Sequence, residues 1–192
     1  MPRSGKISVW AIVVGVLVLL GLWLWTGYNG LVTGQTAVQG AWAQVETNYQ
    51  RRVDLVPNLV ATVKGAANFE QTTLQQVTAA RTQWMEAPGR QEKLAAAQNM
   101  ETALGRLLVT VEAYPQLQSV AAFRDLMTQL EGTENRISVA RKDYNDAVGA
   151  FNITVRRFPT NILALLFGFP QEKFFEAAPG SEVAPTVDFG TK

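Results

Sequence analysis

The feature that most constrains this chain is residues 7–25, a predominantly apolar stretch without one charged residue. A helix over this stretch is about 28 Å long, close to the thickness of the hydrocarbon core of a bilayer. A helix also satisfies its own backbone hydrogen bonds, as lipid requires. Aromatic side chains that favour the headgroup region flank the stretch on both sides. The sequence therefore predicts a transmembrane helix over 7–25, with four membrane-interface anchors: Trp10, Trp23, Trp25 and Tyr28.

A cleaved signal peptide is the competing interpretation, because Arg3 and Lys6 precede the stretch. The stretch is, however, longer than the about 7–15 residues of a signal-peptide core. An A-x-A site occurs only well beyond its end, at Ala41-Trp42-Ala43. We therefore favour an uncleaved single-pass anchor in a bacterial inner membrane. The positive-inside rule predicts that residues 1–6 are cytoplasmic and that the body is extracytoplasmic.

Helical periodicity dominates the rest of the chain. From Trp42 an apolar stripe with alternating steps of three and four runs to Met85, and the turn signal Ala87-Pro88-Gly89 follows. Pro57 lies inside this pattern, so a kink is expected near Val53. Glu70 interrupts the stripe, whose positions are Trp42, Val45, Tyr49, Val53, Val56, Leu59 or Val60, Val63, Ala67, Leu74, Val77 and Trp84.

The last helix has the most regular pattern, because aromatic and aliphatic residues recur at every seventh position and the phase continues through Gly132. These residues are Phe123, Leu130, Ile137, Tyr144, Phe151 and Phe158. The predicted fold is all-α: the transmembrane helix, a linker over 26–35 that is either weakened by its glycines or a continuation of the transmembrane helix, and an elongated, coiled-coil-like antiparallel bundle over 36–160. The bundle has long, short and long helices over 36–85, 91–113 and 116–157. An apolar segment, 161–177, and a flexible tail, 178–192, complete the prediction.

Catalytic chemistry is not indicated by the residue types. The chain has no histidine and no cysteine, which removes the commonest general base, the thiolate nucleophile and the commonest transition-metal ligands. The formal net charge is +1, unlike a nucleic-acid-binding domain. The carboxylate pairs Glu131/Glu134 and Asp143/Asp146 have arginine and lysine nearby, so surface ion pairing explains them best. We therefore expect no enzyme, no catalytic residue, no cofactor, no metal, no nucleic acid and no small-molecule substrate.

Two groups of residues are candidates for contacts. Arg51 or Arg52, beside the stripe of the first long helix, is expected to pair across the bundle with Asp143 or Asp146, with Asn145 nearby. Simple solvent exposure is the alternative. Such a pair would fix helix register more than it would stabilise the bundle. The apolar segment is expected to cap the bundle, contact another subunit or touch the membrane through Leu165, Leu166, Phe167, Phe169, Phe174 and Phe175.

Two motifs in this order resemble the LemA family. The first is residues 41–45, 51–60 and 63–65, and the second is residues 131–137 and 139–141. The match continues through 143–148, Phe158-Pro159, Gly168-Phe169 and Phe175-Glu176, so the resemblance covers about residues 7–176. Phe69 departs from it, since many relatives carry a histidine there. The resemblance implies a single-pass bacterial membrane protein with a helical body and implies no catalytic residue.

These observations favour a membrane-anchored helical scaffold that self-assembles. Its expected partners are the lipid bilayer, further copies of the chain, and another membrane protein. The alternatives are a membrane-shaping or lipid-binding protein, in which the apolar segment is a second membrane contact, and an adaptor of a membrane protein-quality-control complex.

Overall fold

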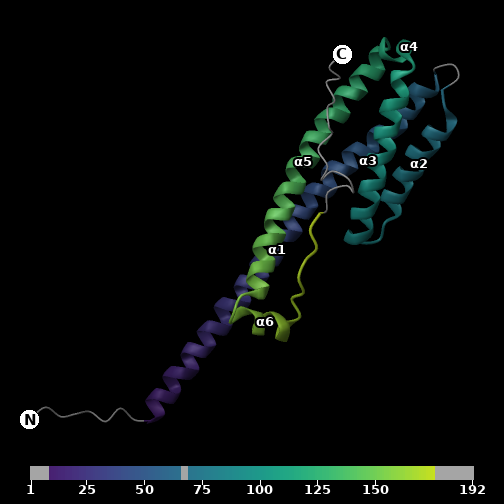
Figure 1. Ribbon diagram of the computed structural model, residues 1–192. Coiled ribbons are helices and arrows are strands. Elements are labelled where there is room, and N and C mark those ends of the chain that lie inside the picture. Colours follow the sequence, from purple (N-terminus) through teal and green to yellow (C-terminus); the bar gives the residue numbers. More distant parts are fainter. Residues whose placement is uncertain (1–8, 66–68, 176–192) are drawn as a thin grey trace, which may run out of the picture. The chain divides into compact units, whose positions relative to one another are not determined.

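The computed structural model describes residues 9–65 and 69–175, and every regular element in those ranges is an α-helix. The all-α prediction is therefore confirmed. The predicted cytoplasmic segment 1–6 and the predicted tail 178–192 lie outside the described residues. In chain order the helices are α1 (Val9–Lys64), α2 (Gln71–Glu86), α3 (Arg90–Glu112), α4 (Pro115–Gln118), α5 (Ala121–Arg156) and α6 (Thr160–Phe167) (Figure 1).

The chain divides into two compact units, and α1 and α5 contribute to both. The first unit contains the chain up to Ala43 together with Lys142–Phe174, so it includes the apolar start of α1, the end of α5 and α6. The second unit contains Gln44–Arg141 and Phe175. It includes the end of α1, all of α2, α3 and α4, and the start of α5.

The second unit is a helical bundle with alternating helix directions. Tyr49 of α1 stacks on Trp84 of α2, whose rings lie 4.7 Å apart, and Arg81 reaches Val53 one turn further along α1. Helix α3 runs back along α2, because Gln83 contacts Asn99 and Gln76 contacts Arg106. The core contains buried side chains of α1, α2, α3 and α5: Val45, Tyr49, Val53, Val56, Leu59, Val63, Leu74, Val77, Trp84, Leu94, Met100, Leu104, Leu107, Phe123, Leu130 and Ile137.

The prediction of a single helix over 36–85 is wrong, because α1 ends at Lys64 and α2 begins at Gln71. Tyr49 and Trp84 would be about 52 Å apart in one continuous helix, whereas here they stack. Glu70, which interrupts the stripe, is the extended residue before α2, and its carboxylate accepts a hydrogen bond from Thr73. The heptad spacing indicated one helix because the apolar residues of α1 and α2 keep the same spacing along the sequence although the chain reverses direction between the two helices.

Helix α1 continues through Pro57. A proline inside a helix leaves the carbonyl four residues earlier without its backbone donor, which here is Val53. The guanidinium Nε of Arg81 in α2 donates to this carbonyl at 3.3 Å. A side chain from the neighbouring helix therefore replaces the hydrogen bond that Pro57 removes.

In the first unit α1 and α5 also run antiparallel. Trp42 packs edge-on against Tyr144, and further towards the start of α1 a Cβ built at Gly34 would lie 3.0 Å from the ring of Phe151. The structure selects the second alternative for the linker 26–35, since these residues continue α1 without a break. Glycine there permits close approach: a Cβ built at Gly27 would lie 2.5 Å from Leu163 of α6. Packing against α5 and α6 offsets the low helix propensity of glycine.

Helix α5 passes through Gly132 as the uninterrupted phase predicts, but it begins at Ala121 rather than at residue 116. Pro115 starts the separate short helix α4, because proline suits the first turn of a helix and not its interior. The heptad stripe ends before Phe158, which follows α5 and is exposed. The expected apolar segment contains α6. This helix ends at Phe167, and Gly168 after it adopts the left-handed conformation (φ 72°).

Candidate functional site

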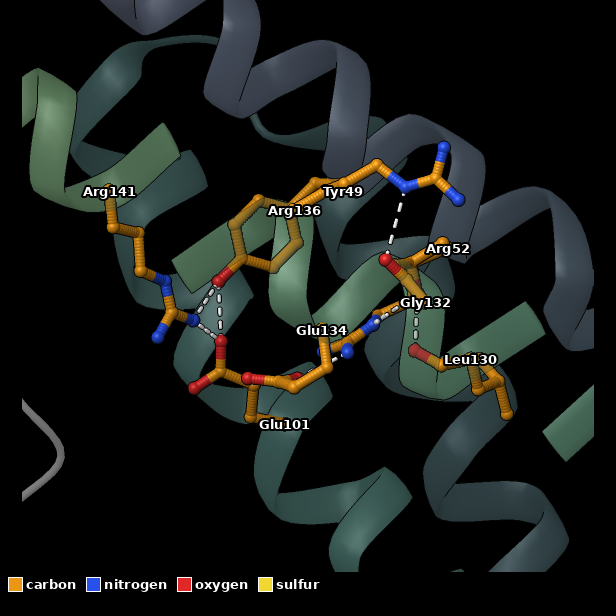
Figure 2. A network of polar contacts seen from close by, with 9 residues as sticks. Tyr49, Arg52, Glu101, Leu130, Gly132, Glu134, Arg136 and Arg141 are labelled. Atoms are coloured by element: carbon orange, nitrogen blue, oxygen red, sulfur yellow. Dashed lines mark hydrogen bonds and ion pairs between the residues drawn. The ribbon is translucent and has the colours of Figure 1, made fainter. Parts of the chain in front are cut away.

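A buried polar cluster lies in the core of the helical bundle, and Tyr49 of α1 is at its centre. The Tyr49 hydroxyl donates to a carboxylate oxygen of Glu101 in α3 and accepts a hydrogen bond from the guanidinium of Arg141 in α5. Arg141 also forms an ion pair with Glu101 (Figure 2). Three helices therefore meet through one hydroxyl, one carboxylate and one guanidinium.

Aromatic rings enclose this cluster. Tyr49 stacks on Trp84 on one side and lies 6.5 Å from the nearly parallel ring of Phe175. The guanidinium carbon of Arg141 is 4.3 Å from the centre of the Phe175 ring and 5.5 Å from that of Tyr49. Such cation–π contacts stabilise a positive charge that has lost part of its water. Phe175 is thus buried in the bundle, and its predicted role as an assembly or membrane contact is wrong.

A second ion pair crosses the bundle between α1 and α5. Arg52 is almost completely buried, and its guanidinium pairs with the carboxylate of Glu134 while its Nε donates to Thr133 at 3.4 Å. Thr133 in turn donates to the Leu130 carbonyl at 2.7 Å. Figure 2 shows Arg52 and Glu134 in the neighbourhood of the Tyr49 cluster. A third pair, Lys93 with Glu46, links α3 to α1.

The predicted cross-bundle arginine is therefore present, but its predicted partner is wrong. Arg52 pairs with Glu134, whereas Asp146 pairs with Lys142 of its own helix at 2.6 Å. Asp143 and Arg51 are exposed, and Asn145 is half-buried. The physical reason is register. Helices α1 and α5 are antiparallel and Tyr49 contacts Arg141, so the turn of α1 after Tyr49, which contains Arg52, lies beside the part of α5 before Arg141, which contains Glu134. Glu134 is an exposed, ion-paired carboxylate as expected, but its partner Arg52 belongs to another helix, and Arg141 is partly buried and pairs with Glu101 of α3.

Burial sets the electrostatics of the central cluster. Loss of water raises the pKa of Tyr49 to about 12, although the neighbouring Arg141 acts in the opposite direction. Burial lowers the pKa of the Arg141 guanidinium, and its hydrogen bond to Tyr49 opposes that shift. A tyrosine with a raised pKa is a poor base and a weak acid near neutral pH. Tyr49 is therefore protonated near neutral pH, and its hydroxyl serves as the donor to Glu101 and the acceptor from Arg141.

An open groove of about 350 Å³ lies next to this network in the second unit. Its apolar wall comes from α3 and α5, and its polar residues include Arg52 and the two carboxylates that already pair with arginine. The lining residues are Arg52, Glu101, Leu104, Gly105, Leu108, Met127, Leu130, Glu131 and Glu134.

The apolar part of α1 is exposed along its length. This helix is long and apolar enough to cross a membrane, with a mean hydropathy of 2.3 over its most apolar window, none of which is buried. Among the predicted interface anchors, Trp10 and Trp25 are exposed and Trp23 is half-buried. Tyr28 differs from them, because its ring contacts Phe167 and Phe169 at 5.0 and 5.9 Å.

The C-terminal segment is held to α5 before it reaches the bundle. The Asn152 side chain donates to the Glu172 carbonyl and accepts from the Glu172 amide, both at 2.8 Å, and Tyr144 donates to the Lys173 carbonyl. Leu165 and Leu166 are exposed as expected for a contact surface, whereas Phe167 and Phe174 are partly covered.

Sequence patterns did not indicate Tyr49, Glu101, Arg141 or Phe175 as one cluster. Arg141 offered one usable signal, because it lies four residues after Ile137 and three before Tyr144 and thus at the border of the apolar stripe of α5. Its partner could not be derived from periodicity, since Glu101 belongs to a different helix. Comparison with known proteins adds the next constraint: residues 41–189 match the LemA family.

The chain belongs to the LemA family. The match contains the polar cluster, the bundle and α6. Several relatives are similar over most of their length. The magnetosome proteins MamQ 1 and MamQ 2 of Paramagnetospirillum magneticum are each 30% identical to this chain, over 92% of the chain and 72% of the relative. MamQ of Magnetospirillum gryphiswaldense is 27% identical with the same coverage, and protein LemA of Metamycoplasma hominis is 22% identical over 78% of the chain and 69% of the relative.

These relationships assign this LemA family member to the membrane-associated bacterial proteins. None of the four names denotes an enzyme. Family membership and the exposed apolar helix therefore agree on membrane association.

Proposed function

We propose that this LemA family protein is a membrane-tethered scaffold whose helical bundle serves as an interaction module and whose copies self-assemble. The observation that carries the proposal is the double role of α1. Its exposed apolar start is suited to lipid, and its later turns supply Val45, Tyr49 and Val53 to the bundle core. The bundle core therefore includes residues of the anchoring helix itself, so a continuous helical backbone tethers the bundle to the anchor.

The buried network supports a structural role for the bundle. Its charged groups are paired between helices, as Arg52 with Glu134 and Arg141 with Glu101. Partly buried pairs between helices fix register and helix order more than they add to stability. A module with one fixed arrangement presents constant outer faces, which is what a scaffold requires.

Self-assembly is tested with the full-length protein. Native mass spectrometry after gentle detergent extraction should give a discrete oligomer, and a uniform monomer would contradict the proposal. Because the chain contains no cysteine, single substitutions provide a matched pair of probes. Leu108 in α3 and Val139 in α5 are both exposed. If copies meet through one specific interface, the Leu108→Cys and Val139→Cys variants should form cross-linked dimers to very different extents.

The same absence of cysteine permits a test of orientation. We place the N-terminus in the cytoplasm and the bundle outside it, because Arg3 and Lys6 precede the apolar stretch and the next charge is Glu46. A cysteine at Val109, an exposed residue of α3, should then react with a membrane-impermeant maleimide in intact cells. Labelling that occurs only after cell lysis would show that the bundle is cytoplasmic and would contradict this orientation.

The relatives named as magnetosome proteins support a role at a membrane. An adaptor role is the second candidate. Co-purification from gently solubilised membranes separates the two: recovery of the chain with itself supports self-assembly, and stoichiometric recovery of another membrane protein supports an adaptor.

A further inference from the structure

Helix α6 has one face that packs on the protein and one that does not. It contains no charged residue. Leu163 and Ala164 are buried, whereas Leu165 is 87% exposed, Leu166 71% and Ile162 53%. Large aliphatic side chains with this degree of exposure, gathered on one short helix, indicate a surface that contacts something apolar.

The docking position of α6 indicates what that apolar partner is. Leu163 lies against Gly27 of α1, where a built Cβ would be only 2.5 Å away, and Phe167 and Phe169 lie against Tyr28. Gly27 and Tyr28 closely follow Trp25, the last residue of the predicted transmembrane segment. A helix held beside the end of a transmembrane span is at the depth of the headgroups and the upper acyl chains.

Positive charge next to α6 has the sign that suits a lipid surface. Arg156 and Arg157, at the end of α5, are exposed. With Asn152, Gln171 and Phe174 they line an open groove of about 540 Å³. Guanidinium groups bind phosphate oxygens well, and anionic lipids attract basic residues close to the membrane.

The geometry points to α6 as a second membrane contact, embedded on its side in the leaflet where the C-terminal end of the α1 span emerges. Ile162, Leu165 and Leu166 enter the acyl region, and Arg156 and Arg157 contact headgroup phosphates. Helix α6 is about 12 Å long and cannot span the bilayer. This inference rests on the anchoring of α1 in the membrane and is independent of the scaffold role.

The test requires the full chain, because a fragment that begins after Gly27 and Tyr28 lacks the docking site of α6. Single cysteines at Leu165, Val18 and Val109 carry an environment-sensitive nitrobenzoxadiazole probe in protein reconstituted into vesicles of phosphatidylcholine and phosphatidylglycerol. Val18 lies in the apolar run of α1, and Val109 is a matched exposed valine of the bundle. Bromine-labelled lipids then quench each probe according to its depth.

We expect the Leu165 probe to have blue-shifted emission and to be quenched several-fold more than the Val109 probe, most strongly by bromine near the headgroup. The Val18 probe should be quenched most strongly by bromine deep in the acyl chains. A Leu165 probe that stays unquenched while Val18 is quenched overturns the inference and leaves anchoring intact. An unquenched Val18 probe overturns both. A Leu165 emission that is blue-shifted, unquenched and lost on dilution with lipid identifies a second copy as the partner and also overturns the inference.

Discussion

The guanidinium of Arg52 in α1 is almost completely buried and pairs with the carboxylate of Glu134 in α5, which is half exposed. This difference in burial makes the two halves of the pair unequal. Removing Glu134 leaves a buried positive charge without a partner. Removing Arg52 leaves a carboxylate that can turn to water.

Glu134→Gln should consequently destabilise the bundle by about 1–3 kcal/mol, and Arg52→Met by about 1 kcal/mol or less. Urea unfolding of the full-length protein in mild detergent, followed by circular dichroism, measures both. Arg136→Met is the matched control, because that guanidinium is exposed and donates only to the Gly132 carbonyl of its own helix. Equal losses for Glu134→Gln and Arg52→Met would contradict the asymmetry.

The raised pKa of Tyr49 predicts a loss of stability at alkaline pH. Since the folded-state pKa is about 12 and the ordinary value is 10.0, the protonated hydroxyl favours the folded state. This contribution is complete below pH 10 and is lost as the pH rises towards 12. Tyr49→Phe should lose about 1 kcal/mol at neutral pH through its missing hydrogen bonds. Its unfolding midpoint should fall less steeply than that of the wild type over this range, and parallel curves would contradict the prediction.

The hydrogen bond from Arg81 to the Val53 carbonyl should depend on Pro57. Arg81→Met is expected to cost about 1–2 kcal/mol, because it leaves this carbonyl without a donor. With Pro57→Ala the backbone amide at position 57 can donate to Val53, so the same Arg81 change should cost close to nothing. A double-mutant cycle in urea unfolding measures the difference. Additive effects of the two substitutions would show that Arg81 stabilises the bundle in some other way.

The close packing of α6 on α1 predicts a difference between two glycines of α1. Gly27→Leu should displace α6, because Leu163 occupies the space that a side chain needs, whereas a Cβ at Gly30 meets no atom within 4 Å. A cross-link by a short bismaleimide between cysteines at Tyr28 and Phe167, whose rings lie 5.0 Å apart, reports the docking. Its formation should be slowed by Gly27→Leu and unaffected by Gly30→Leu, and equal slowing would rule out packing at Gly27 as the cause.

Charge beside α6 gives a prediction about lipid composition. Arg156→Gln with Arg157→Gln should weaken the preference of α6 for anionic vesicles, by about 1 kcal/mol for each arginine near the surface. Quenching of a probe at Leu165 in vesicles with and without phosphatidylglycerol measures that preference. Arg51→Gln with Arg90→Gln removes the same charge from the bundle and should leave it unchanged. A loss of equal size with this control pair would indicate a general effect of net charge.

Much of the fold could be predicted because helical periodicity is a local property. The apolar stretch, the core positions of each helix and the passage of α5 through Gly132 are all visible along the chain. The division of 36–85 into two helices was missed, since Tyr49 and Trp84 keep the same heptad phase although the chain reverses between them. Gly65 and Glu70, which flank that reversal, were weak signals against a continuous stripe.

The sequence by itself determined that the chain is all-helical, which faces of the long helices are apolar and which segment is suited to a bilayer, because these properties depend on neighbours three, four and seven positions away. Only the tertiary structure decided that Arg52 pairs with Glu134, that Arg141 and Glu101 meet at Tyr49, and that Gly27 receives Leu163. Such contacts depend on the register between antiparallel helices. Register is set by the packing of whole helix faces and by the exclusion of water, so it cannot be read from the spacing of apolar residues within one helix.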